Sequence, residues 1–208
     1  MLIIRKLFKI LKENKLNNMQ VVLVGAQSTG KTSVMNALPA EYKNCGIREV
    51  IRNMVAQDPT VHVNQESNDW TQNRFFFEYI YLFAKYPDYI SDRGLVDVCA
   101  YTLWLTKIGK VDHVTYEKQM YVLQDWLKTH PDVIHVYFPI YFPVVDDGFR
   151  DANEENRKAV DECIRDVIDE LVKQGLWKGY TIGDLPVIDR VDEICDIITY
   201  HWPEDALE

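Results

Sequence analysis

Residues 25–33 place glycine, lysine and hydroxyl side chains at a spacing that suits phosphate chemistry. They read Gly25, Ala26, Gln27, Ser28, Thr29, Gly30, Lys31, Thr32 and Ser33, which fits the pattern G-x-x-x-x-G-K-[ST]. Glycines let the backbone curve so that its N–H groups converge on an anion, and the lysine can reach the β- and γ-phosphates. The threonine hydroxyl can take a place on Mg²⁺. We therefore predict that these residues bind a nucleoside triphosphate.

The sequence on either side of this loop supplies the elements that the pattern requires. Residues 20–24 form a short, β-branched apolar run that is typical of a buried strand, and a helix is predicted to follow the loop. The positive N-terminal end of that helix would add to anion binding. The alternative is a chance match, and the strand–loop–helix context argues against it.

An acid and an arginine follow the next clear strand, at residues 88–92. Asp92 ends the strand and Arg93 comes next. In a chain with a phosphate loop, an acid in this place can face Mg²⁺ or the attacking hydroxyl, and an arginine can hold a phosphate bidentately. The structural alternative is that Asp92 caps the following helix. We predict catalytic roles for both residues and a metal contact for Asp92.

Glu49 and Arg52 form a second acid–arginine pair, where the second strand should meet its helix. Glu49 could accept a proton or a hydrogen bond from an acceptor hydroxyl, which makes it a second candidate for the catalytic base. A surface ion pair between residues three apart on a helix explains the pattern equally well. Both residues are predicted to contact the acceptor.

Two arginines bracket the polar segment that opens the helix predicted at 153–173. Arg150 follows Asp146-Asp147-Gly148, and Arg157 lies one to two turns further on. Such a segment can close over a triphosphate and bring arginines onto the transferred group. We predict a lid at about 140–157 with two catalytic arginines; a solvated loop with ion pairs is the alternative.

Residues 68–79 are rich in aromatic and amide side chains. Trp70, Gln72 and Arg74 could form a pocket for a base by stacking and amide hydrogen bonds. An aromatic stripe on a helix is more often part of the core. These three residues are predicted to bind the acceptor.

Helices and strands alternate along the chain in a way that can bring these residues together. The clearest remaining strand is 133–138, and 180–182 is a possible last strand. Strands separated by helices predict a parallel sheet with right-handed crossovers. The predicted helices are 47–57, 69–86, 95–107, 113–129, 153–173 and 190–200.

Composition indicates one globular α/β domain. The chain has 208 residues, 47% of them hydrophobic, and a net charge of −9. These values exclude a mainly disordered chain and argue against a protein that coats nucleic acid. No apolar run is long enough to span a membrane. Four widely spaced cysteines without a C-x-x-C pair indicate a reducing, cytoplasmic compartment.

Residues 1–18 differ from the rest because they are basic and have apolar residues at roughly helical spacing. We expect either a helix that binds a membrane surface or an anionic partner, or a segment that packs on its own domain. Met19 could also be a natural start. The domain with the phosphate loop is expected to span 19–208.

The motifs together resemble a known family. GAQSTGKTS, the E-x-x-R of Glu49 and Arg52, the strand-end DRG with Asp97 and Tyr101 downstream, and VVDDGFRD are similar to the AAA-type, kinase-like ATPases related to the ribosylnicotinamide kinase domain. These are phosphate-loop kinases common in phages and bacteria. Deoxynucleoside and thymidylate kinases are more distantly similar.

The resemblance implies a three-layer α/β/α fold with a five-stranded parallel sheet of order 2-3-1-4-5 and an arginine-bearing lid. It also implies transfer of a phosphoryl group from ATP, with Mg²⁺, to a nucleoside, a nucleotide or a similar small acceptor. A modified base or an end in DNA is an alternative acceptor. A non-catalytic nucleotide-binding module remains a further alternative. A regulatory GTPase would need an N-K-x-D motif after the fourth strand, which the sequence lacks.

Overall fold

A parallel sheet of five strands lies at the centre of the computed structural model, which describes residues 18–143 and 153–203. The strand order is β2-β3-β1-β4-β5, so the predicted order is confirmed. Every neighbouring pair is parallel. The strands are β1 (Gln20–Val24), β2 (Gly46–Ile47), β3 (Tyr89–Ser91), β4 (Ile134–Tyr137) and β5 (Gly179–Thr181).

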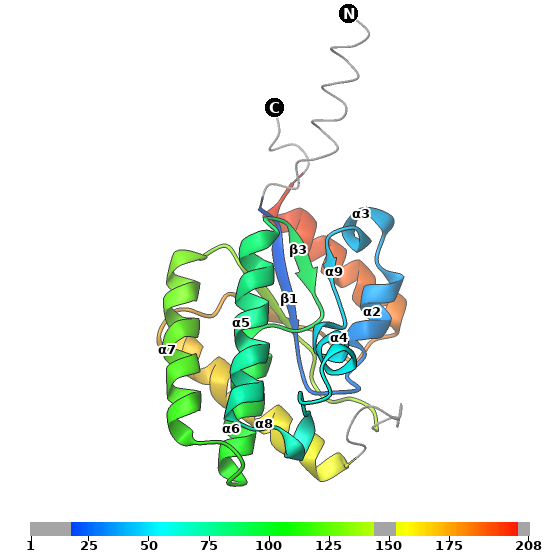
Figure 1. Ribbon diagram of the computed structural model, residues 1–208. Helices are drawn as coiled ribbons and strands as arrows, with labels where there is room; N and C mark the ends of the chain where they lie inside the picture. Colours follow the sequence, from blue (N-terminus) through cyan, green and yellow to red (C-terminus); the bar gives the residue numbers. More distant parts are fainter. Residues whose placement is uncertain (1–17, 144–152, 204–208) are drawn as a thin grey trace, which may run out of the picture.

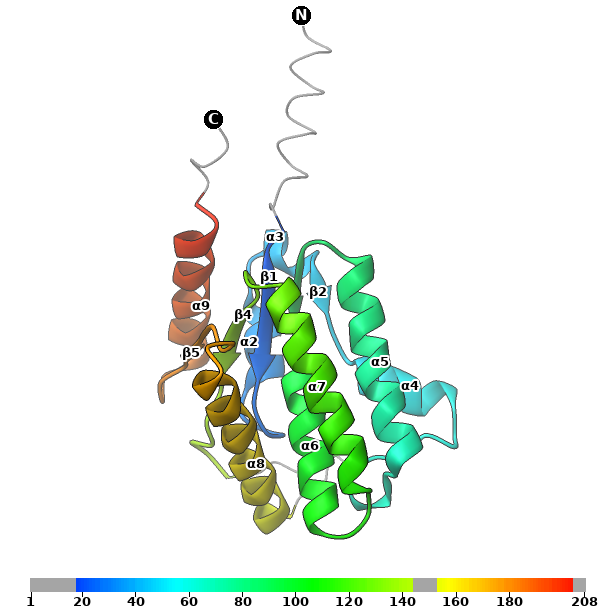
Figure 2. The same cartoon turned by 90° about the vertical axis from the view of Figure 1, so that its left-hand side faces the viewer.

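Helices cover both faces of the sheet, which confirms the three-layer architecture (Figures 1 and 2). On one face α2 and α9 pack against the sheet, and on the other lie α5, α6, α7 and α8. The helices are α2 (Lys31–Ala37), α3 (Ala40–Lys43), α4 (Val50–Gln57), α5 (Asp69–Lys85), α6 (Leu95–Lys107), α7 (His113–Thr129), α8 (Glu154–Lys173) and α9 (Val187–His201), with a short 3₁₀ turn η1 (Asn64–Glu66).

Strand β1 is apolar on both sides because both of its faces are buried. Val21 and Leu23 belong to the cluster under α2 and α9, whereas Val22 and Val24 belong to the cluster under α5 to α8. Successive side chains of a strand point to opposite faces, so a central strand between two helical layers needs a continuous apolar run. This is why residues 20–24 could be recognised from the sequence.

The helix predicted at 47–57 begins later, at Val50, because the chain first adds a short strand. Gly46 and Ile47 pair with β3, and Glu49 has a φ of +52°, which no helical residue adopts. A second strand was expected just before Glu49, but a strand of two residues is too short to show a period, so the local pattern did not give its bounds. The other predicted elements are confirmed within a few residues at their ends.

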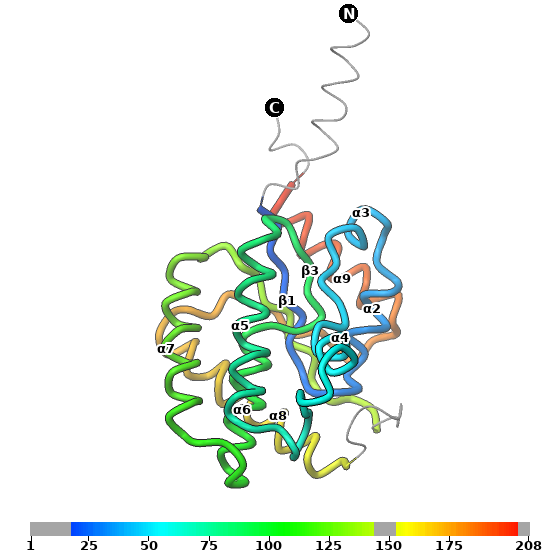
Figure 3. Tube along the Cα trace, in the orientation of Figure 1, coloured from blue at the N-terminus to red at the C-terminus, as the bar shows by residue number. Residues whose placement is uncertain are grey.

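The parallel arrangement brings three loops to one edge of the sheet. The loop after β1, the turn between β2 and α4, and the turn after β3 all follow carboxyl ends of neighbouring strands. Figure 3 traces this route, in which the chain follows β1 to the loop, returns through α2 to α3, and comes back through β2 to α4. In open α/β sheets this edge is where ligands bind.

Two predicted segments lie wholly or partly outside the described residues. The basic segment 1–18 is described only at Asn18, and the lid predicted at 140–157 is described only at its two ends. Within the described part of the chain, no helix is both long and apolar enough to cross a membrane.

Candidate active site

The loop after β1 curves as its sequence predicts, and two of its residues have to be glycine. Gly25 has a φ of +156°, and a Cβ there would lie 2.7 Å from the carbonyl oxygen of Phe138. Gly30, which has a φ of +93°, forms the N-cap of α2. Ser28 also adopts a positive φ, of +56°. These conformations turn the loop around a concave space at the start of α2.

Lys31 points into the concave side of this loop. Its ammonium group donates hydrogen bonds to the carbonyl oxygens of Gly25 (2.5 Å) and Ala26 (2.7 Å) and to Oγ1 of Thr29 (3.1 Å). Only 6% of the residue is exposed, so the charge lies in a sheltered part of the site. A cation held there lies next to the N-terminus of α2, which is where a phosphate group would bind.

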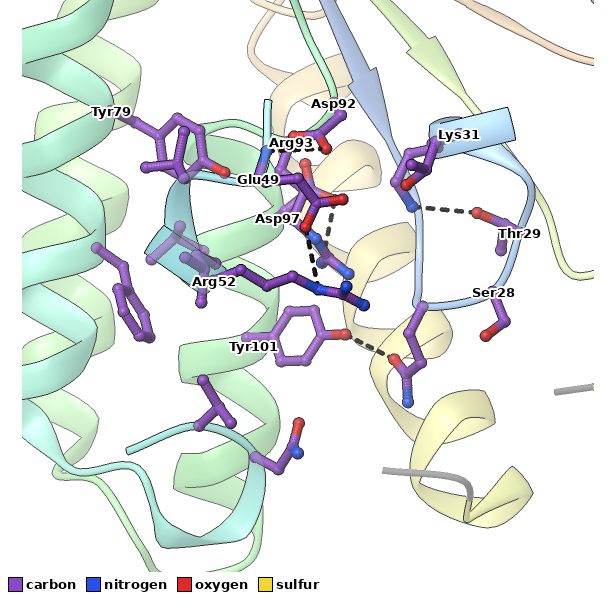
Figure 4. Close-up of a pocket in the computed structure, with 18 of the residues that line it drawn as sticks. Ser28, Thr29, Lys31, Glu49, Arg52, Tyr79, Asp92, Arg93, Asp97 and Tyr101 are labelled. Carbon is purple, nitrogen blue, oxygen red and sulfur yellow. Dashed lines mark hydrogen bonds and ion pairs between the residues drawn. The ribbon is translucent and has the colours of Figure 1, made fainter. Parts of the chain in front are cut away.

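A cavity of about 430 Å³ opens beside the loop and reaches the ends of β2 and β3. Residues 27–33 form one wall (Figure 4). The opposite wall combines charged and aromatic side chains from the turns after β2 and β3 and from α4, α5 and α6. Its polar members include Glu49, Arg52, Gln72, Tyr79, Asp92, Arg93, Asp97 and Tyr101.

Asp92 and Glu49 meet at this wall through the backbone. The amide N–H of Glu49 donates to Oδ2 of Asp92 at 3.4 Å, and the Glu49 side chain pairs with Nε of Arg52 at 3.0 Å. The left-handed backbone of Glu49 costs about 1–3 kcal/mol in a residue that is not glycine. The turn therefore holds the Glu49 backbone beside the Asp92 carboxylate at the expense of local strain.

Asp97 joins the two phosphate-site loops, a role that our residue predictions did not include. Its carboxylate accepts the backbone N–H of Gly25 (3.0 Å) and of Gly94 (3.1 Å), and Arg93 Nη1 lies 4.0 Å away. Burial raises the pKa of this carboxyl, and the nearby Arg93 and Lys31 oppose the rise. The sequence did contain a signal for the role of Asp97 at this turn. Asp97 is the third residue of α6, a position where an acid completes a capping box.

Tyr101 and Tyr79 line the same wall, and neither was predicted as a site residue. The Tyr101 hydroxyl donates to Oε1 of Gln27 at 2.6 Å, and the Arg93 guanidinium lies over its ring. The Tyr79 hydroxyl is buried and has no hydrogen-bond partner among the described residues. Burial, followed by the charge of Asp92, raises the pKa of the Tyr79 phenol. Figure 4 shows this hydroxyl pointing toward the Asp92 side of the cavity.

Arg157 lies behind the loop instead of facing the cavity. Its guanidinium donates to the carbonyl oxygens of Gln27 (2.9 Å), Ser28 (3.1 Å) and Phe142 (2.7 Å), and to Glu154 Oε2 (3.1 Å). The side chain is 0% exposed. This geometry supports the loop backbone and differs from the direct phosphate contact that we expected. The second predicted arginine, Arg150, lies outside the described residues.

A second buried arginine, Arg190 of α9, supports the same loop and was missed in the sequence. Its Nη1 donates to the carbonyl oxygen of Thr29 (3.2 Å), and its Nε donates to that of Leu185 (2.7 Å). The rings of Tyr141 and Phe142 lie 5.6 and 4.8 Å from its guanidinium carbon. No local motif marks this residue, because its partner is 161 positions away in the chain.

The structure separates Trp70, Gln72 and Arg74, the three residues predicted to form a pocket for a nucleobase. Gln72 is buried in the cavity wall, where it donates to Ser67 Oγ (2.7 Å) and accepts from Thr102 Oγ1 (3.1 Å). Trp70 and Arg74 are not among the cavity-lining residues. The Arg74 guanidinium stacks 4.7 Å from the exposed Trp70 ring and also pairs with Asp58. Of the three residues, only Gln72 therefore lines the cavity, because the other two lie on the outward side of α5.

Comparison of the sequence with protein families identifies the chain. A sequence profile described as an AAA domain matches residues 20–174. The chain belongs to this AAA-domain family. The match runs from β1 through α8, so it includes the loop and both strand-end turns. No protein of curated function matches the sequence.

Solved structures with the same fold, all at low sequence identity, include two that are named as kinases. Deoxyadenosine kinase from M. mycoides, with the products dCMP and dCDP bound, has a TM-score of 0.61 at 13% identity, over 88% of this chain and 99% of that one. Thymidylate kinase from Candida albicans has a TM-score of 0.57 at 15% identity, over 88% and 91%. NadR protein in complex with NR has a TM-score of 0.63 at 18% identity, over 93% of this chain and 54% of that one.

The site of this AAA-domain protein suits a metal ion that arrives with a nucleotide. Within the described residues, no group of three or more His, Cys, Asp or Glu side chains could hold a metal alone. Mg²⁺ needs fewer protein ligands than that, because it usually binds one or two protein groups together with substrate phosphates and water. Thr32 and Asp92 both line the cavity, so the predicted pair of metal-binding residues faces one space.

Proposed function

We propose that this protein transfers the γ-phosphoryl group of ATP to a hydroxyl or phosphate oxygen of a nucleoside-like small molecule. One observation carries the proposal. The phosphate-binding loop and the Asp92–Glu49 pair line a single cavity, so a donor and an acceptor can meet between them. Phosphoryl transfer depends on such positioning and on charge stabilisation more than on covalent chemistry by the protein.

The donor side consists of the loop and the first residues of α2. The amides of residues 27–31 and the Lys31 ammonium would hold the β- and γ-phosphates, and the Thr32 hydroxyl would contact the metal. Bound Mg²⁺ would neutralise charge on the phosphates. Arg157 and Arg190 keep the loop carbonyls turned away from the phosphates by binding them from behind.

The acceptor side consists of the strand-end carboxylates and the arginines paired with them. An acceptor oxygen attacks the γ-phosphorus while the bond from that phosphorus to the β–γ bridging oxygen breaks, and ADP leaves. The proton of an acceptor hydroxyl passes to Asp92 or Glu49. Arg52 and Arg93 supply positive charge beside the reacting oxygens, and Gln72 presents an amide for a base. Arg150 remains the arginine that we predict to reach the γ-phosphate from the lid.

The similar solved structures support a nucleoside-like acceptor. Two of them are named as deoxyadenosine kinase and thymidylate kinase, and the match with this chain covers most of the length of each. A cavity of about 430 Å³ also has the size of a small-molecule site. This support favours a small acceptor over an end or a base in DNA.

A substrate panel tests the proposal. The protein is incubated with Mg²⁺-ATP and with nucleosides, nucleoside monophosphates, nicotinamide riboside or DNA carrying modified bases, and mass spectrometry identifies which compound gains one phosphoryl group. We expect transfer to a small acceptor, and Lys31→Ala should abolish it. The matched control is Lys43→Ala, on the exposed side of the neighbouring helix α3.

Three results would contradict the proposal. Transfer to DNA alone would select the polynucleotide acceptor, whereas ATP binding without transfer to any compound would select a non-catalytic nucleotide-binding module. Transfer at the normal rate by Lys31→Ala would remove the assigned donor site.

A further inference from the structure

The hydroxyl of Tyr79 is a polar group of the cavity wall to which the proposed reaction assigns no task. Tyr79 lines the cavity and is 0% exposed, and its hydroxyl has no hydrogen-bond partner in the part of the chain that the structure describes. Other buried polar atoms there also lack partners, but none of them belongs to a residue that lines the cavity. An unpaired buried hydroxyl is costly, and a molecule bound in the cavity would supply the partner.

The sequence of α5 places Tyr79 on the same helical face as Gln72. Gln72, Phe75 and Tyr79 follow one another at steps of three and four residues, and all three line the cavity. The Tyr79 ring packs against that of Phe83, with 5.7 Å between the ring centroids. Gln72 and Tyr79 are separated by about 10 Å along the helix axis. When an acceptor presents its base to Gln72, the part of the acceptor that lies at Tyr79 is therefore its sugar.

Charged side chains from three segments act on the Tyr79 hydroxyl. They are Glu49 from the turn after β2, Asp92 and Arg93 from the turn after β3, and Asp97 from α6. Burial, followed by the charge of Asp92, raises the pKa of the phenol well above its usual value, and Arg93 opposes the rise. The phenol therefore stays protonated at neutral pH, so it can donate one hydrogen bond and accept another.

These surroundings favour a hydroxyl as the partner of Tyr79. A phosphate or carboxylate of the acceptor would be repelled by Asp92 and Glu49 at this place. A carbonyl oxygen could accept from Tyr79, but it would present only lone pairs to the two carboxylates. A hydroxyl can accept a hydrogen bond from the phenol and donate its own proton to a carboxylate, so it satisfies both kinds of neighbour.

The position of Tyr79 indicates a hydroxyl other than the one that reacts. Figure 4 shows Asp92 and Glu49 between Tyr79 and Lys31, and Lys31 is not among the charges that act on the phenol. The reacting oxygen must lie next to the γ-phosphate, which the proposed function places at Lys31. An acceptor oxygen at Tyr79 lies further from the donor and has a binding role.

We propose that Tyr79 is a specificity-determining residue whose hydroxyl binds a second, non-reacting hydroxyl on the sugar of the acceptor. The proposal rests on the proposed function, because it requires a nucleoside-like acceptor. An acceptor that lacks this hydroxyl would leave both the phenol and a carboxylate without their partner. A site that is built to bind a substrate hydroxyl discriminates strongly against the analogue without it.

Kinetics with acceptors that lack single hydroxyls test the proposal. Adenosine, cytidine, guanosine and uridine, as nucleosides and as 5′-monophosphates, are compared with analogues that lack the 2′-, 3′- or 5′-hydroxyl, with Mg²⁺-ATP as donor. An analogue without the reacting group accepts no phosphoryl group and so identifies that group. Among the others, we expect one position whose loss lowers kcat/KM of the wild type at least about tenfold. In Tyr79→Phe this preference should shrink at least about threefold, because the two hydroxyls act as a pair.

Tyr89 of β3 provides the matched control. It is also 0% exposed with a hydroxyl that lacks a partner among the described residues, but it does not line the cavity. Tyr89→Phe should therefore leave the preference unchanged. Circular dichroism and the Kd for ATP check that both variants are folded.

The outcomes separate this proposal from the proposed function. Transfer by the wild type with equal kcat/KM for all analogues that keep the reacting group would overturn the role of Tyr79 alone. So would a preference that Tyr79→Phe leaves intact, or one that Tyr89→Phe reduces as much. A wild type that transfers to none of these compounds would contradict the proposed function, and the role of Tyr79 with it.

Discussion

Replacing Arg157 with methionine separates two roles for this residue. A catalytic arginine would act on the γ-phosphate, and its loss would lower kcat while stability stayed the same. The structure instead shows a guanidinium that is 0% exposed and holds the carbonyls of Gln27, Ser28 and Phe142. We therefore expect Arg157→Met to lower stability and weaken ATP binding.

The size of the effect follows from the hydrogen bonds that are lost. The bond to Gln27 is buried, and those to Ser28 and Phe142 are partly buried. A buried bond from a charged donor contributes about 1.5–3 kcal/mol and a partly buried one about 0.5–1.5 kcal/mol. The expected loss is about 2.5–6 kcal/mol in the free energy of unfolding. In a chain of this length that lowers Tm by about 5 °C or more.

Thermal unfolding, calorimetric titration with ATP and steady-state kinetics measure the three quantities separately. The Kd for ATP should rise at least about tenfold, because the carbonyls of Gln27 and Ser28 determine the curvature of the loop. Lys158→Met is the matched control, since Lys158 lies on the exposed side of the same helix and should change stability by less than about 0.5 kcal/mol. Arg157→Lys, which keeps the charge and can keep one of the bonds, should lose about half as much stability.

The opposite pattern of effects would contradict a structural role for Arg157. If Arg157→Met unfolded at the wild-type temperature and bound ATP normally but had a strongly reduced kcat, the guanidinium would act on the transferred group. The carbonyl contacts would then be unimportant for the loop, and the prediction from the sequence would stand.

Three further predictions concern the acceptor wall and the core. Asp92→Asn should lower kcat at least about 10²-fold with little change in the Kd for ATP; if activity persists and Glu49→Gln abolishes it, Glu49 is the base. Tyr79→Phe should raise the acceptor KM several-fold without changing the KM for ATP, because its buried hydroxyl faces the acceptor side; equal effects on both KM values would indicate a purely structural role. Burial lowers the pKa of His135, which stacks on Trp177, to about 4. Between pH 4 and 6.5, His135 therefore binds more protons in the unfolded chain than in the folded protein. The free energy of unfolding is highest above pH 6.5 with respect to this group, and it decreases as pH falls through this range. Between pH 7.5 and 5 the loss is about 2 kcal/mol, and His135→Phe should remove that part of the pH dependence in urea unfolding.

Much of the fold could be predicted because its signals are local. The run 20–24 is continuous and apolar since β1 is buried on both faces, and the long helices α6 and α7 end where their patterns end. The phosphate loop depends on backbone conformations that glycines at fixed spacing allow, so its position was readable as well. A second strand was expected before Glu49, but the bounds of β2 could not be read, because two residues carry no period and the pairing with β3 is long-range.

The sequence by itself therefore determined the phosphate loop, the order of the elements, and the family to which the chain belongs. Only the tertiary structure decided which side chains face the cavity. Gln72 and Trp70 are two residues apart, yet the turn of α5 sends one into the cavity wall and the other outward. Arg157 carries the charge expected of a catalytic residue, but two of its partners are backbone carbonyls of the phosphate loop, 130 and 129 residues earlier in the chain. Motifs report residue types and local spacing, whereas the direction of a side chain depends on contacts that distant segments make only after folding.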